Sequence, residues 1–226
     1  TGTASNASGA TGDFSIADKI IHTGDTNTAI RFPAADTFTV ETSGSEAIRV
    51  DSSQRLLVGT TTSDLVAGYR TSVQIADTGD GSGVSIFRYT DNVHPATLNF
   101  GKSRSGTLNT NTLVSSGDSL GMIQFGGADG SSFRSAASIT GVVDGTPGSG
   151  DMPGRLVFST TADGASSATE RLRITSAGRV NTVGIVSATG GVQVAAAATI
   201  FANGNATFSG IGTFGGTSHV RIPVGT

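Results

Sequence analysis

A short pattern recurs along the chain and limits what the chain can fold into. Residues 47–58 read AIRVDSSQRLLV, and the earlier residues 29–40 read AIRFPAADTFTV. Residues 171–180 read RLRITSAGRV, and residues 219–223 repeat a fragment as HVRIP. Each copy sets an arginine between two apolar residues, and the three longer copies continue with a turn and a second strand-like run. This period of two predicts β-hairpins that have apolar residues on one face and an arginine on the other.

Such a hairpin cannot fold alone, because two strands bury too little apolar surface to offset the entropy lost on ordering the chain. The repeats must stack on each other, close against copies in other chains, or do both. Glycine accounts for 33 of 226 residues, about twice the usual share of roughly 7%. Aromatic residues make up only 6%. This composition gives a thin core, and an elongated oligomer tolerates a thin core better than a single globule does.

The charge and cysteine content exclude several classes of protein. With a net charge of −3, the chain lacks the excess of basic residues that is typical of a nucleic-acid binder. No apolar run approaches the roughly 18–20 residues that span a membrane. The chain has no cysteine, so it contains no disulfide framework.

Four regions are predicted, all of them β-structured or irregular. Residues 1–12 form a linker and 13–62 a β-hairpin repeat shaft. Residues 63–180 form a β-rich domain, inserted into the shaft and ending in a repeat hairpin. Residues 181–226 form a thin β shaft that continues toward a C-terminal part outside this sequence. Within the β-rich domain, Asp-Gly turns separate strand-like runs at 72–75, 83–89, 97–100, 122–125, 138–143 and 155–158.

Part of the β-rich domain resembles a known family. Residues 117–130 read GDSLGMIQFGGADG and residues 151–164 read DMPGRLVFSTTADG, with VDGTPG between them at 143–148. Together with TERLRI at 169–174, these segments resemble a block common in bacteriophage tail fibre proteins, as do the repeats at 29–62. The resemblance implies an intertwined, parallel homotrimer on the virion that contacts other tail or fibre proteins and reaches the host surface. It also implies surface glycan as the ligand class. Many relatives end in a self-cleaving chaperone domain, which this sequence lacks, so a trimmed product or a fragment is expected.

The residues that could carry chemistry are scattered. The three histidines, His22, His94 and His219, are isolated, so neither a metal site nor a cofactor is predicted. Asp144 and Asp151 flank a Gly/Pro loop and could form the carboxylate pair of a polysaccharide-cleaving enzyme, although turn-forming aspartates explain them more simply. Residues 79–83 read GDGSG, which predicts a turn because no lysine or helix follows. The repeat arginines, Arg31, Arg49, Arg173 and Arg221, are expected to pair with carboxylates such as Glu46 and Glu170.

The sequence therefore predicts a structural and adhesive virion component and no enzyme. Receptor contact is assigned to residues 63–168, with the loop at 89–95 and the two tyrosines, Tyr69 and Tyr89, as candidates. For both tyrosines, packing between strands is the favoured alternative. Two other functions stay open: a polysaccharide-degrading tailspike, and a bacterial surface adhesin or filament subunit.

Overall fold

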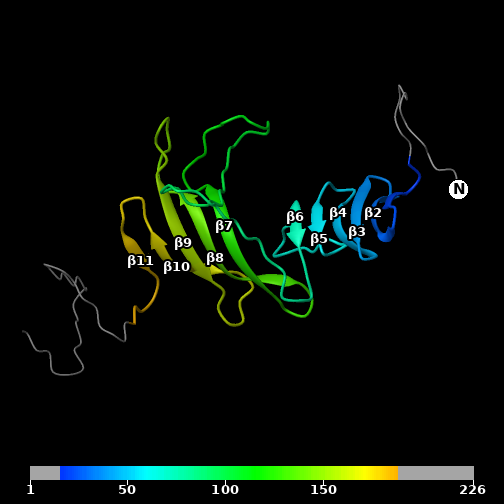
Figure 1. Cartoon of the computed structure of the whole chain (residues 1–226). Coiled ribbons are helices and arrows are strands. Elements are labelled where there is room, and N and C mark those ends of the chain that lie inside the picture. The colour runs from blue at the N-terminus through cyan, green and yellow to red at the C-terminus, as the bar shows by residue number, and fades with distance from the viewer. Residues whose placement is uncertain (1–15, 188–226) are drawn as a thin grey trace, which may run out of the picture. The chain divides into compact units, whose positions relative to one another are not determined.

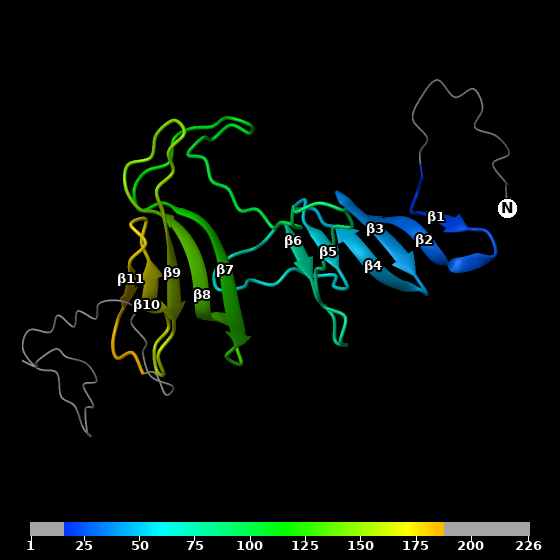
Figure 2. The ribbon, with the colours of Figure 1, turned by 60° about the vertical axis from the view of Figure 1, so that its left-hand side comes forward.

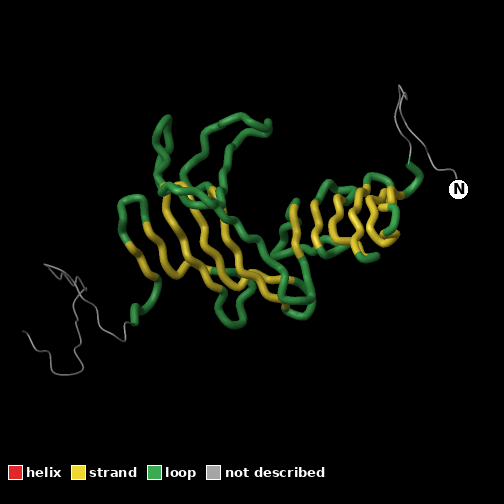
Figure 3. The backbone as a smooth tube through the Cα atoms, viewed as in Figure 1, coloured by secondary structure: helices red, strands yellow, loops and turns green. Residues whose placement is uncertain are grey.

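The computed structural model describes residues 16–187, and within that range the chain is all β (Figures 1 and 3). The first sheet holds six strands in chain order: β1 (Lys19–His22), β2 (Asp25–Ala34), β3 (Thr37–Thr42), β4 (Ser45–Val50), β5 (Leu56–Val58) and β6 (Val73–Ile75). The second sheet holds five: β7 (Ser119–Ala128), β8 (Phe133–Val143), β9 (Gly154–Thr160), β10 (Thr169–Ile174) and β11 (Val180–Thr182). Each strand pairs with its neighbour in sequence, so the second sheet is an antiparallel meander and the first is a meander over β1 to β5 with β6 added at its end. Figure 2 shows the strands of each sheet side by side from a second direction.

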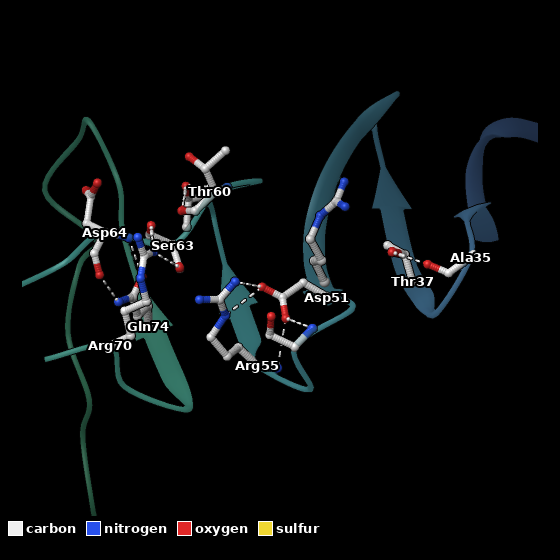
Figure 4. Close-up of polar contacts among 12 residues, drawn as sticks. Ala35, Thr37, Asp51, Arg55, Thr60, Ser63, Asp64, Arg70 and Gln74 are labelled. Atoms are coloured by element: carbon white, nitrogen blue, oxygen red, sulfur yellow. Dashed lines mark hydrogen bonds and ion pairs between the residues drawn. The ribbon is translucent and has the colours of Figure 1, made fainter.

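All pairs are antiparallel except β5 and β6, which run parallel. The connection between these two strands is held by polar contacts of its own (Figure 4). Gln74 on β6 donates to the backbone carbonyl of Asp64 and accepts from the Asp64 amide, and Arg70 donates to Ser63. These contacts fix a short crossover without a helix.

The same hairpin is built in both sheets, at residues 46–59 and 170–183, and we call it the E-x-x-R hairpin. Glu46 pairs with Arg49 through two hydrogen bonds of 2.7 and 2.6 Å, and Glu170 pairs with Arg173 in the same way. Residues three apart normally lie on opposite faces of a strand. Here one extra residue interrupts the ladder between each pair, so both side chains lie on one face.

Backbone bonds of the two hairpins match as well. The carbonyls of the extra residues, Ala47 and Arg171, accept from the amides of Gly59 and Val183. The predicted hairpins and their arginine–glutamate pairs are thus confirmed at both places.

Four of the strand-like runs of the β-rich domain are confirmed, in β6, β7, β8 and β9. The predictions for 83–89 and 97–100 are wrong for the single chain, because neither segment has a strand partner among residues 16–187. The predicted linker at 1–12, and most of the predicted thin shaft with His219 and Arg221, lie outside the described residues.

Few side chains are fully enclosed. Within the described range the buried apolar residues are Ala29, Leu57, Val114, Val142 and Val143. The thin core expected from the composition is therefore present, and it leaves most large apolar side chains at least partly exposed to solvent.

Candidate assembly face and receptor-contact loops

One face of the first sheet carries an uninterrupted aliphatic row. Strand pairing places six side chains opposite one another, one from each strand: Ile20, Ile30, Val40, Ile48, Val58 and Ile75. A second row runs beside it through Phe32, Phe38, Val50, Leu56 and Val73. We call these two rows the apolar face. It is open to solvent, with Ile20 51% and Val73 55% exposed.

The opposite face is polar, yet it is better covered. Arg31, Thr39, Arg49 and Leu57 follow one another across the strands, and Leu57 and Thr39 are only 0% and 1% exposed. Arg31 bonds Asp18 with two nitrogens and Glu41 with a third. The long arginine side chains therefore shield this face with their stems while their charges stay paired. The sheet leaves its apolar side uncovered and closes its charged side.

The second sheet repeats this arrangement. Ile123, Ile139, Phe158 and Leu172 form an aliphatic and aromatic row across β7 to β10. The neighbouring row contains Gly121 and Gly141, and Phe100 lies over Gly121. A Cβ added at Gly121 would lie 2.3 Å from the Cβ of Phe100, so the missing side chain makes room for the ring.

The segment before β7 is held by one carboxylate. Asp118 accepts two bonds from Arg104, of 2.7 and 2.8 Å, and one from the amide of Ser115. Lys102 lies 3.4 Å from the same carboxylate. Hydrogen bonds from the Arg104 guanidinium and, with a smaller effect, from the Ser115 amide hold the pKa of Asp118 well below its ordinary value. Asp118 therefore stays ionised and fixes the base of a loop that extends away from β7 (Figures 1 and 2).

The outer part of this loop is ordered by Ser103, whose hydroxyl donates to the carbonyl of Thr110 and accepts from the amide of Thr112. Leu108 lies at the far end and is 91% exposed. This loop was not predicted from the sequence, because its anchor, Asp118, is separated from Arg104 in the chain and is brought to it only by the fold. A fixed loop with an exposed apolar tip is suited to contact with a partner surface.

The two tyrosines lie in different surroundings. Tyr69 closes a tight turn with Val66 and is 62% exposed beside Met122 and Gln124 of β7. Tyr89 is 93% exposed, and its ring lies 6.3 Å from that of Phe87. His94 follows in a turn closed by Asn92. The structure thus does not bring the two candidate tyrosines into one site.

The carboxylates considered for catalysis have structural partners. Asp144 accepts from Arg155 at 2.8 Å and from the backbone amide of Ser176 at 2.8 Å. Hydrogen bonds from the Ser176 amide and, with a smaller effect, from Arg155 lower the pKa of Asp144 to about 2. A general acid needs a raised pKa, so Asp144 is unsuited to that role. Asp151 closes a turn with Gly148. Across residues 16–187, no three histidine or carboxylate side chains gather as a metal site would require.

A hollow of about 570 Å³ lies at the β7–β8 turn, and its lining combines polar side chains with Ala128, Ala136 and Ala165. We call it the polar hollow after its charged and hydroxyl groups. Asp129 and Arg134 form an ion pair at its rim, and Ser135, Thr161 and Ser166 complete its polar lining. Hydroxyl and charged groups without an aromatic platform could hydrogen-bond a sugar, so the hollow is a second candidate for host contact within 63–168.

The sequence matches no protein-family model and no curated protein. Two solved structures share its fold. The carboxy-terminal domain of the bacteriophage T5 L-shaped tail fibre, solved with its intra-molecular chaperone domain, gives a TM-score of 0.58 at 14% identity over 83% of this chain. A structure of the same carboxy-terminal domain gives 0.53 at 17% identity, covering 83% of each chain. The chain has the fold of a bacteriophage tail-fibre domain.

The tail-fibre fold confirms the resemblance that residues 117–174 and the repeats suggested. The chain spans 58% of the T5 structure that includes the chaperone domain. The described part of this tail-fibre-like chain has no helix that could cross a membrane.

Proposed function

We propose that the chain is a segment of a phage tail fibre, assembled as a parallel, intertwined homotrimer on the virion, where it positions or makes host-surface contact. The observation that carries this proposal is the open apolar face. It crosses all six strands of the first sheet, and the ion-paired face behind it needs no further cover. A contiguous apolar surface of this extent is typical of an interface.

Copies of the same chain are the occupant that fits this face. Its rows consist of Ile, Val, Leu and Phe without a charge, so like faces can meet around one axis without burying an unpaired ion. The second sheet offers an equivalent row. Both sheets can therefore close against their counterparts in neighbouring copies.

Sedimentation of the purified chain tests the assembly. At micromolar concentration we expect a homotrimer and no folded monomer, because the single chain encloses so few apolar side chains. A folded monomer under these conditions would contradict the proposal.

Host contact is the second part of the proposal, and we assign it to residues 63–168. This region supplies the anchored loop with Leu108 at its end, the turn at Asn92–His94 and the polar hollow beside Arg134. Three copies on one axis convert a weak contact into useful avidity. Surface glycan is the proposed ligand class, and other fibre or tail proteins are the proposed partners at the ends of the segment.

A further inference from the structure

β7 is the one long strand at a sheet edge in the described range, and residues 121–125 have no strand paired to their outer edge. Natural edge strands are blunted by short length, by charge or by a covering segment. Of the other edge strands, β6 and β11 have three residues each, and β1 has four including Lys19. β7 has ten residues, SLGMIQFGGA, without one charge or proline. Between its two ladder irregularities, residues 121–125 run as a regular strand.

The outward backbone groups of this stretch have no backbone partner among residues 16–187. A regular edge of this kind accepts an added strand. The added strand must be extended and must bring free backbone donors and acceptors of its own.

Residues 83–89, GVSIFRY, have these properties. Four of the seven are β-branched or aromatic, which is strand composition. The structure gives them no strand and no hydrogen bond within the described part of the chain. Val84 is 73% exposed and Phe87 is 74% exposed. The same chain therefore contains a strand-forming segment with bare apolar side chains and a sheet edge that lacks a strand.

The two faces of this segment match the two sides of β7. On an extended chain, Val84 and Ile86 point one way, and Phe87 and Tyr89 point the other. The first pair would lengthen the apolar row that begins at Ile123. The second pair would enter a hollow of about 460 Å³ next to β7, lined by Val66, Tyr69, Arg70, Thr71, Met122 and Gln124. The Phe87–Tyr89 rings already lie 6.3 Å apart, as two side chains sharing one hollow would.

The single chain does not make this pairing itself. Its residues 98–100 lie against the face of the second sheet, where Phe100 covers Gly121 and Leu98 lines a hollow with Ile139. The chain thus reaches β7 over the face of the sheet and leaves the edge free. A neighbouring copy presents the same unpaired segment. Each chain can therefore supply residues 83–89 to one neighbour and the outer edge of its β7 to another. Head-to-tail contacts of this kind close into a ring when the rotation between copies allows it.

We infer that residues 83–89 of one copy add as a strand to the outer edge of β7 in a neighbouring copy. This exchange rests on the proposed homotrimer and gives it a residue-level interface. Val84 and Ile86 join the apolar row of the neighbouring sheet, and Phe87 and Tyr89 fill the hollow beside Met122. Tyr89 then acts in packing between strands, which leaves receptor contact to other parts of the 63–168 region.

Disulfide trapping tests the exchange, and the natural chain helps because it has no cysteine. Four double variants combine Val84→Cys or Ile86→Cys with Ile123→Cys or Phe125→Cys, which covers the registers that place these side chains on the same face. Directly opposed residues in adjacent strands bring their Cβ atoms within disulfide reach. After oxidation, at least one variant should run as a covalent trimer on a non-reducing denaturing gel, because each chain is bonded to both neighbours.

The matched control moves the second cysteine to Val180 on β11, at the opposite edge of the same sheet, and should give no covalent trimer. An oxidised monomer without free thiols would place the segment on its own chain and overturn the exchange. Absence of any link in all four variants, with a trimer still seen by sedimentation, would overturn the exchange and leave the proposed function standing. Absence of the trimer in the unmodified chain would overturn both.

Discussion

Single carboxylates fix the turns and loops of this molecule. Asp144, directly after β8, accepts from Arg155 on β9 and from Ser176 in the β10–β11 turn, so one side chain joins the end of β8 to β9 and to that turn. Asp118 does the same for the loop before β7. Since these carboxylates accept hydrogen bonds from charged or backbone donors, their ionised form is favoured in the folded chain.

Replacing Asp144 should lower stability in a pH-dependent way. Its folded pKa of about 2 lies below the ordinary value. The stabilisation is therefore complete above the ordinary pKa of about 4 and is lost as the pH falls through the folded value. Asp144→Asn should melt at a lower temperature than the unmodified protein at pH 7, and the difference should shrink toward pH 2. The control, Asp91→Asn in an exposed turn, should show no such convergence. A constant difference for Asp144→Asn at all pH values would contradict the ionic origin.

Gly121 makes room for Phe100, so Gly121→Ala should destabilise the protein. The added Cβ would lie 2.3 Å from the Cβ of Phe100 and 2.8 Å from its ring. We expect a loss of about 1–3 kcal/mol in the free energy of unfolding.

A matched control for this change lies on the same strand. At Gly127 an added Cβ meets nothing within 4 Å, so Gly127→Ala should change stability by less than about 0.5 kcal/mol. Adding Phe100→Gly to Gly121→Ala should remove the clash, because the nearest atom is the Cβ of Phe100. Chemical denaturation of the unmodified chain, the two single variants Gly121→Ala and Phe100→Gly, and the double variant measures the coupling. Equal effects of the two alanine substitutions would show that Phe100 does not lie on Gly121.

At the scale of elements, the E-x-x-R hairpin divides its side chains between two tasks. Its ion pair covers one face, and its aliphatic residues form the other, so Ile48 and Leu172 occupy equivalent places in the two sheets. The rows that these apolar side chains form are only partly covered in one chain. The side chains are therefore available for contacts outside their own sheet.

Ile48→Asp and Leu172→Asp should each abolish trimer formation. An unpaired buried charge costs about 3–5 kcal/mol, and threefold symmetry repeats that cost in every copy. Ser53→Ala, in the exposed turn of the first hairpin, should be nearly silent. Sedimentation with thermal melting compares the three variants. Aspartate variants that assemble with unchanged melting temperature would mean that the apolar face lies toward solvent.

The hairpins could be predicted because their signal is local. Alternation in the segment around Ile48 and turn residues after Val50 are enough to place two strands and an arginine. The extra residue at Ala47 was not predicted, because a ladder irregularity depends on the partner strand. For the same reason, the strand predicted at 83–89 is absent from the single chain: its residues favour a strand, but a strand also needs an edge to pair with. The Asp118 anchor escaped prediction because its partners are brought to it only by the fold.

At the scale of the whole molecule, the described chain has two sheets with open apolar faces and very little enclosed core. This arrangement separates assembly from recognition. In the proposed homotrimer the strands use their apolar residues to close against other copies, whereas the loops of 63–168 can change without disturbing that contact.

Loop replacement locates the host contact. Trimers in which residues 106–110 or residues 90–95 are replaced by glycine and serine are compared with the unmodified trimer for binding to susceptible cells. We expect loss of binding from at least one replacement without loss of the trimer, because both segments are exposed and lie outside the strands. The Arg134→Ala variant tests the polar hollow in the same assay. Unchanged binding by all three variants would contradict the assignment of contact to these surfaces.

The E-x-x-R hairpin also bears on how such a chain can change in length. Each copy brings its own ion pair, its own turn, and a closing backbone bond from Gly59 or Val183 to the extra residue, while its first strand pairs with the strand before it. An inserted unit would therefore bring its own polar contacts and present a strand edge on each side with which its neighbours can pair. Tandem duplication of the gene segment that encodes one hairpin would therefore add strands to a sheet in whole hairpin steps.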